Sequence, residues 1–143
     1  MPLILHILHV AGAVFIVGPM VVVPMLGLRA IRTGDSLQLR GLVRSSIGLG
    51  IGTILVAVIG FGVMYTQTED QLSVSTPWIL WSLILLAIAI VLHFAVVVPL
   101  LSRAAARTGE PSRSSGYGPV AGASGIVSLL LLVIVILMVA QPS

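Results

Sequence analysis

The chain has no cysteine and no lysine, and only 8% of its 143 residues are charged. The absence of cysteine excludes disulfides, thiolate metal ligands and a thiol nucleophile. Hydrophobic residues make up 58% of the chain, and the mean hydropathy is +1.21. Such a chain cannot present a polar surface to water on every side. It is therefore predicted to be an integral membrane protein. A water-soluble catalytic domain is excluded, and nothing points to nucleic-acid binding.

Charge is missing altogether from four long apolar stretches. Each is close to or above the roughly 20 residues that a helix needs to cross about 30 Å of hydrocarbon. The stretches are Leu3–Leu28, Ile47–Tyr65, Trp78–Leu101 and Val120–Ala140. We therefore predict an all-α protein, a four-helix bundle in the membrane, with residues 1–143 forming a single transmembrane domain.

The few charges that are present are distributed unevenly. All 7 basic residues are arginines, and they lie between the first and second or the third and fourth stretches. The middle connection carries Glu69 and Asp70 instead. The positive-inside bias places the arginine connections in the cytoplasm and both termini outside. We expect the arginines to attract anionic lipid head groups, with Arg32 and Arg107 as candidates for an anion site. Abundant Ala, Val and Gly without lysine favours a GC-rich bacterial genome, and hence the bacterial inner membrane.

One segment occurs twice, 75 positions apart. Residues 21–35 and 96–110 are identical at nine of fifteen positions, with a proline and an Arg-Thr-Gly run in one register. This predicts two helical-hairpin repeats, about 3–65 and about 78–140, related by an axis along the membrane normal. Pro24 and Pro99 are expected to bend the first helix of each hairpin. Gly34 and Gly109 are expected to end it with a left-handed cap.

Small residues at helical spacing mark predicted contact faces. Lipid provides no hydrophobic drive between helices, so close backbone approach over small residues is a main source of association. The predicted faces are Gly48 with Gly52 in the second helix, and Gly118, Gly122 and Gly125 in the fourth. These faces could close the bundle or join subunits, and use within the bundle is favoured.

Histidines are the ionisable residues found inside the apolar stretches, which makes them functional candidates. His6 and His9 share one face of the first helix, whereas His93 lies deep in the third. At about 1.5 Å per residue, about 13 to 18 Å separate the two sites along the membrane normal. His9 and His93 are therefore alternative haem ligands rather than a pair. His6 and His9 with Met64 and Met138 form a weaker copper hypothesis. The structural alternative is that His9 donates to a carbonyl in the bundle.

A serine pattern gives a further hypothesis. Gly122-Ala123-Ser124-Gly125 resembles the serine motif of rhomboid intramembrane proteases, and Ser124 lies at a depth comparable to His93. Those proteases need six helices, and the same glycines already have a packing interpretation. No carboxylate lies inside any apolar stretch, which argues against intramembrane aspartyl proteolysis. The chain therefore leans towards a protein that is not an enzyme.

The run Leu8-His9-Val10-Ala11-Gly12-Ala13-Val14-Phe15-Ile16-Val17-Gly18, followed by arginines, resembles the opening of several families of small bacterial four-helix membrane proteins. One is an uncharacterised predicted integral membrane family common in actinobacteria. More distant ones are the copper resistance D membrane proteins and the haem-binding protoporphyrinogen oxidase of the J type. The resemblance implies that His9 is the haem or metal residue. Ile16 stands where the oxidase and copper patterns have a tryptophan.

Three functions are consistent with these features. The first is a non-catalytic oligomeric module, or an accessory subunit of a larger membrane complex. The second is a haem-b-binding redox or porphyrin-handling membrane protein, and the third is a small oligomeric transporter or channel. The expected partners are the lipid bilayer and further copies of the chain or other membrane subunits.

Overall fold

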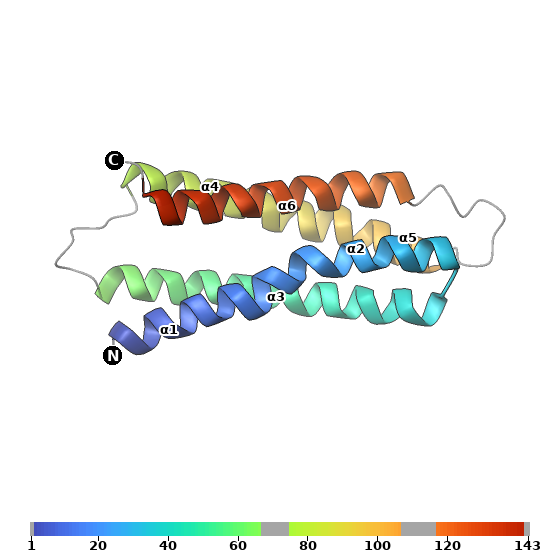
Figure 1. Cartoon of the computed structure of the whole chain (residues 1–143), viewed down its shortest axis with the longest axis horizontal. Coiled ribbons are helices and arrows are strands. Elements are labelled where there is room, and N and C mark those ends of the chain that lie inside the picture. Colours follow the sequence, from blue (N-terminus) through green and yellow to red (C-terminus); the bar gives the residue numbers. More distant parts are fainter. Residues whose placement is uncertain (1, 67–74, 107–116, 142–143) are drawn as a thin grey trace.

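The computed structural model describes residues 2–66, 75–106 and 117–141, and these residues form four long helical rods (Figure 1). Four helical spans are long and apolar enough to cross a membrane: Leu3–Thr33, Leu37–Thr66, Pro77–Ala106 and Gly118–Ala140. The prediction of an all-helical chain with four candidate spans is thereby confirmed. The spans extend further than the apolar stretches, mainly where the arginines lie.

Two of the four rods contain a short π-helical turn. The first rod consists of α1 (Pro2–Gly12), η1 (Ala13–Val17) and α2 (Gly18–Thr33). The second is α3 (Ser36–Thr66) and the fourth is α6 (Tyr117–Ala140). The third rod consists of α4 (Pro77–Leu92), η3 (His93–Val97) and α5 (Val98–Ala106). The labels η1 and η3 denote the π-helical turns.

Each π-helical turn ends two residues before a proline, Pro19 or Pro99. The amide after each turn bonds five residues back, from Gly18 to Ala13 and from Val98 to His93. Proline has no amide and its ring crowds the carbonyl four residues earlier, so a widened turn relieves the crowding. The predicted repeat pairs Pro99 with Pro24, which lies inside α2 without such a turn. The repeat stays a prediction, and the local backbone departs from it here.

The connection between α2 and α3 is only two residues long. Gly34 has φ 71° and its amide donates to the carbonyl of Ala30, as the predicted left-handed cap requires. The Asp35 carboxylate accepts a hydrogen bond from the backbone amide of Gln38 at 3.0 Å and thereby caps the start of α3. Helix α3 therefore begins at Ser36, well before the apolar stretch. The corresponding Gly109 lies outside the described residues.

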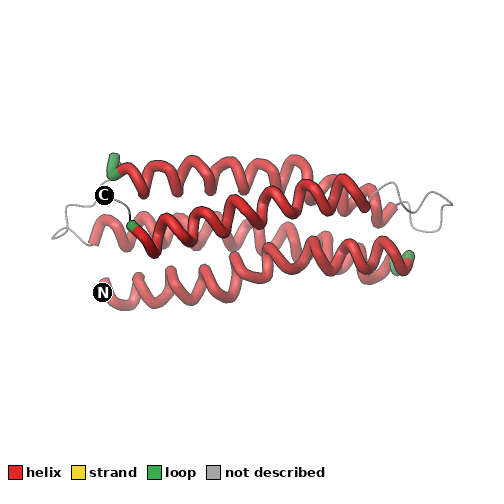
Figure 2. The backbone as a smooth tube through the Cα atoms, turned by 45° about the horizontal axis from the view of Figure 1, so that its top comes forward, coloured by secondary structure: helices red, strands yellow, loops and turns green. Residues whose placement is uncertain are grey.

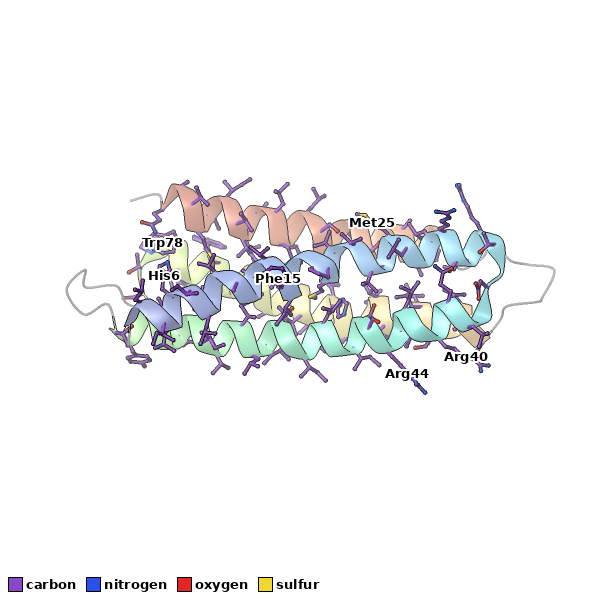
Figure 3. The ribbon with its side chains drawn as sticks, turned by 60° about the horizontal axis from the view of Figure 1, so that its bottom comes forward. His6, Phe15, Met25, Arg40, Arg44 and Trp78 are labelled. Carbon is purple, nitrogen blue, oxygen red and sulfur yellow. The ribbon has the colours of Figure 1, made fainter. Side chains whose placement is uncertain are left out.

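Arg40 and Arg44 consequently lie on α3, not in a connection as their sequence positions suggested. The apolar stretch marks only the part of a helix that fits the hydrocarbon, and the helix itself continues beyond it. Figure 3 shows both arginines at the same end of the bundle, opposite the end that carries His6 and Trp78. We call these two ends the arginine end and the termini end, because α1 begins and α6 ends at the latter (Figure 1).

Helix α3 has neighbours on two sides. It contacts α1, η1 and α2 of the first rod and η3 and α5 of the third. Helix α6 contacts α4, η3 and α2. The rods run lengthwise beside one another in both views (Figures 1 and 2). The largest fully buried apolar side chains are Met20, Leu39, Leu101, Val97 and Val120.

The outward faces of the rods are apolar. Phe15 is 76% exposed and Val139 is 81% exposed. Exposing such apolar side chains costs free energy in water but not in lipid. Several serine and threonine hydroxyls within the helices donate to carbonyls of their own helix, as Ser82 does to Trp78 at 2.7 Å. These hydroxyls are thereby satisfied without water. Both observations fit a bundle whose surroundings are hydrocarbon.

Candidate functional site

His9 reaches α3 from the first rod. Its Nδ1 lies 3.0 Å from the carbonyl oxygen of Val56. A carbonyl can only accept, so Nδ1 carries the proton, and in a neutral ring Nε2 then has the lone pair. The ring covers Gly60, where a Cβ would lie 2.7 Å from Cε1 of His9. His9 is half-buried, and this bond meets the expectation that it donates to a carbonyl in the bundle.

His93 reaches α3 from the third rod and is wholly buried. Its Nε2 lies 2.9 Å from the carbonyl oxygen of Ser46, so here Nε2 is the donor. The ring is edge-on to Phe94, with centroids 5.4 Å apart. It also covers Gly50, where a Cβ would lie 3.0 Å from Cδ2 of His93. Nδ1 of His93 and the hydroxyl of Ser46 have no hydrogen-bond partner among the described residues.

The two contacts share one pattern. Helix α3 offers a carbonyl at one position and a glycine four positions later, Val56 with Gly60 and Ser46 with Gly50. A helical side chain leans over the turn before its own Cα, so the residue at the later position would normally shield that carbonyl. Glycine leaves the second lone pair of the carbonyl open to an imidazole. Two glycines thus allow α3 to hold a histidine from each neighbouring rod.

The histidines do not form one site. The accepting carbonyls are ten residues apart on α3, which is about 15 Å along the helix. This agrees with the separation expected from sequence depth, and it keeps His9 and His93 as independent candidates. His6 is exposed on α1, one turn closer to the termini end than His9.

The proposed copper set is only partly brought together. Met64 lies on α3, one turn from Gly60 on the face that contacts α1. Met138 is 40% exposed on α6, whose main contacts are with α4, η3 and α2 rather than with α1. Among the described residues there is no group of three or more His, Cys, Asp or Glu side chains that could hold a metal ion. The copper hypothesis therefore keeps His6, His9 and Met64 at most.

The serine pattern is accounted for locally. The Ser124 hydroxyl donates to the Val120 carbonyl at 2.6 Å, one turn back in α6. Ser128 in turn donates to the Ser124 carbonyl at 2.8 Å. These are the bonds by which serines satisfy themselves inside a helix. No bond joins Ser124 to His93 in the described part of the chain, so the geometry of a serine and its base is not present there.

Two sets of glycines differ in their surroundings. Interior glycines receive a large side chain from a neighbouring rod, and a Cβ there would meet it at 2.6 to 2.7 Å: Gly12 with Val56, Gly27 with Leu101, Gly50 with Phe94, Gly52 with Ile16, and Gly60 with His9. Open glycines have no described residue within 4 Å of the Cβ position: Gly18, Gly41, Gly48, Gly118, Gly122 and Gly125. Gly62 belongs to neither set, since its Cβ position lies 3.8 Å from Cδ1 of Leu5. Of the five glycines predicted to pack, only Gly52 meets a neighbouring rod among the described residues.

Gly48, Gly118, Gly122 and Gly125 therefore have no packing partner among the described residues of one copy, and the use of their faces stays a prediction. Spacing identifies a face of a helix, but it does not say which way that face points. The interior glycines Gly12, Gly27, Gly50 and Gly60 were missed. The pattern that identifies them is a glycine on one helix opposite a large side chain on the antiparallel neighbouring helix. It can be recognised only when the register between the two helices is known.

The arginine candidates are only partly described. Arg32 is exposed near the end of α2, and Arg107 lies outside the described residues. Arg29, Arg40, Arg44 and Arg103 are also exposed. The predicted pairing of Arg32 with Arg107 stays a prediction.

Four apolar spans and an exposed surface of large apolar side chains define a multi-pass helical membrane protein. Residues 3–142 match the family described as predicted integral membrane protein (DUF2269). The chain belongs to this family. No curated protein and no solved structure matches the chain.

Proposed function

We propose that the chain is a non-catalytic membrane module that assembles with a second copy of itself through one face of α6. This face consists of Gly118, Gly122, Ile126 and Leu129, which follow one another at helical spacing and are all exposed. The observation that supports this proposal is that no described residue lies within 4 Å of the Cβ positions of Gly118 and Gly122. Two small residues one turn apart let a second helix approach closely in lipid.

Self-association is easier through this face of α6 than through the open glycines of α3. Helix α6 carries no charged residue, so two α6 faces can meet without repulsion. On α3 the open Gly41 and Gly48 lie beside Arg40 and Arg44. Two copies meeting there would bring four like charges together in a medium of low dielectric. A different membrane subunit on α6 is the other possible outcome of the test.

Replacing Gly122 with leucine should therefore weaken self-association by about tenfold or more, because the side chain keeps the two helices apart. The measurement is the monomer and dimer population of the full chain in lipid bilayers at varied protein-to-lipid ratio. Gly48→Leu is the matched control, since Gly48 is an open glycine on α3, and it should leave the population unchanged. A wild-type chain that is monomeric at every ratio, or equal effects of both variants, would refute the proposal.

His9 supports a second candidate, a haem-binding protein. Its Nδ1–H bond to Val56 directs Nε2 away from that carbonyl, and in a neutral ring Nε2 could bind a metal as an imidazole oriented by a carbonyl does. His93 does not fit as well, because its Nε2 is engaged by Ser46 and its ring is wholly buried. Between the two predicted haem ligands, the contacts therefore favour His9.

On the haem hypothesis, protein purified from its native membrane should show a Soret band that His9→Ala abolishes. His93→Gln should keep the band, because that imidazole contacts α3 about 15 Å away. The measurement is the visible spectrum of oxidised and reduced protein, with metal analysis of the same sample. A colourless, metal-free wild-type protein would refute haem binding, and the self-assembling membrane module would remain as the proposed function.

A further inference from the structure

The exposed side of α3 at the arginine end combines charge with open space. Arg40 and Arg44 are one turn apart, and both are exposed. Gly48 follows one turn later with nothing within 4 Å of its Cβ position. Ile51 and Leu55 continue the same face, 59% and 58% exposed. In Figure 3 the two arginines point away from the bundle on the same side of α3.

These arginines have no charged partner in the part of the chain that the structure describes. The acidic residue described at this end is Asp35, and its carboxylate already accepts the Gln38 amide at 3.0 Å. Arg44 lies three residues before the apolar stretch that begins at Ile47, so its guanidinium is close to the expected boundary of the hydrocarbon. A guanidinium there can reach the phosphates of the lipid head groups along its flexible stem.

The order of groups along this face matches the order of groups in a phospholipid. Two guanidiniums come first, then the exposed backbone at Gly48, then the apolar side chains of Ile51 and Leu55. A phosphate accepts bidentate bonds from guanidinium. The glycerol and the first part of an acyl chain would fit over the glycine. A soluble anion would not use the apolar half of this face.

We propose that Arg40, Arg44 and the exposed glycine surface at Gly48 bind one anionic phospholipid, with its phosphate between the two guanidiniums and an acyl chain along α3. The single negative charge of the phosphate is shared by two guanidiniums that have no charged partner among the described residues. A lipid held here would also occupy the α3 face and leave the α6 face for a second copy. The inference does not depend on self-association, because it concerns a different helix and a different ligand.

The test uses the full chain in phosphatidylcholine nanodiscs that contain a small share of phosphatidylglycerol. The fraction of spin-labelled phosphatidylglycerol immobilised by the protein is compared with that of spin-labelled phosphatidylcholine. The Arg40→Gln, Arg44→Gln double variant should lower the preference for phosphatidylglycerol about tenfold, in keeping with the attraction of anionic lipid to each arginine. The Arg29→Gln, Arg103→Gln double variant removes the same charge at the same end and should change the preference less than twofold.

Two further arms separate the parts of the site. Gly48→Leu places a large side chain between the arginines and the apolar part of the face without changing the charge, so it should also reduce phosphatidylglycerol immobilisation. Glycerol phosphate, which lacks acyl chains, should not compete with the lipid. Equal losses in the two arginine variants would show a diffuse surface potential and overturn the proposal, as would effective competition by glycerol phosphate. Gly122→Leu should leave lipid binding unchanged whatever its effect on assembly.

Discussion

Leucine at Gly50 is expected to destabilise the bundle by about 3 kcal/mol, the upper range for a large residue forced into a filled core. A Cβ at this position would lie 2.6 Å from Cζ of Phe94 and 3.0 Å from Cδ2 of His93. The larger side chain must push the third rod away from α3, and it covers the Ser46 carbonyl that His93 uses. The measurement is reversible unfolding in mixed micelles with a denaturing detergent.

Gly48→Leu is the control for this prediction. Gly48 lies only two residues away on the same helix, but it faces open space, so leucine there should change the unfolding free energy by less than about 0.5 kcal/mol. The two variants have the same change in composition and helix propensity. Equal destabilisation of both would show that the rods do not meet at Gly50.

His93→Ala should cost about 2 to 4 kcal/mol, because it removes a wholly buried ring and a buried hydrogen bond together. His9→Ala should cost less, about 1 kcal/mol, since His9 is only half-buried. The same unfolding assay measures both. If His9 proved the costlier of the two, the wholly buried position of His93 would be in doubt.

Ser46→Ala distinguishes the contribution of the Ser46 backbone carbonyl to stability from that of its hydroxyl. His93 bonds to the backbone oxygen of Ser46, which alanine keeps, whereas the hydroxyl is buried without a partner among the described residues. Removing an unpaired buried hydroxyl should leave the stability unchanged or raise it by about 1 kcal/mol. A loss comparable to that of His93→Ala would mean that the hydroxyl takes part in holding the ring.

Hydropathy was sufficient to predict the four spans, because an uncharged apolar run of about 20 residues matches the thickness of the hydrocarbon and is rare in water-soluble folds. The left-handed cap at Gly34 was also predictable, since a glycine after an arginine-bearing last turn is a local signal. The start of α3 was not predictable from apolarity. Asp35 caps a helix that begins in the polar region, so Arg40 and Arg44 lie on a helix face rather than in a connection.

The directions of the glycine faces depend on how the helices are rotated about their axes. Gly48 and Gly50 are two residues apart on α3, yet one faces open space and the other faces His93. Their immediate sequence surroundings are almost equally small and apolar. Only the contact of α3 with both neighbouring rods decides between them, and that contact is long-range. The same holds for the carbonyls that receive His9 and His93.

The most direct test of the proposed module uses the absence of cysteine in the chain. A single cysteine replaces Ile126 on α6 or Ile51 on α3, which are 52% and 59% exposed and correspond in the predicted repeat. Disulfide cross-linking is then measured in native membranes with a membrane-permeant oxidant. Assembly through α6 predicts a cross-linked dimer for Ile126→Cys and essentially none for Ile51→Cys. Cross-linking at Ile51→Cys alone, or at neither position, would contradict it.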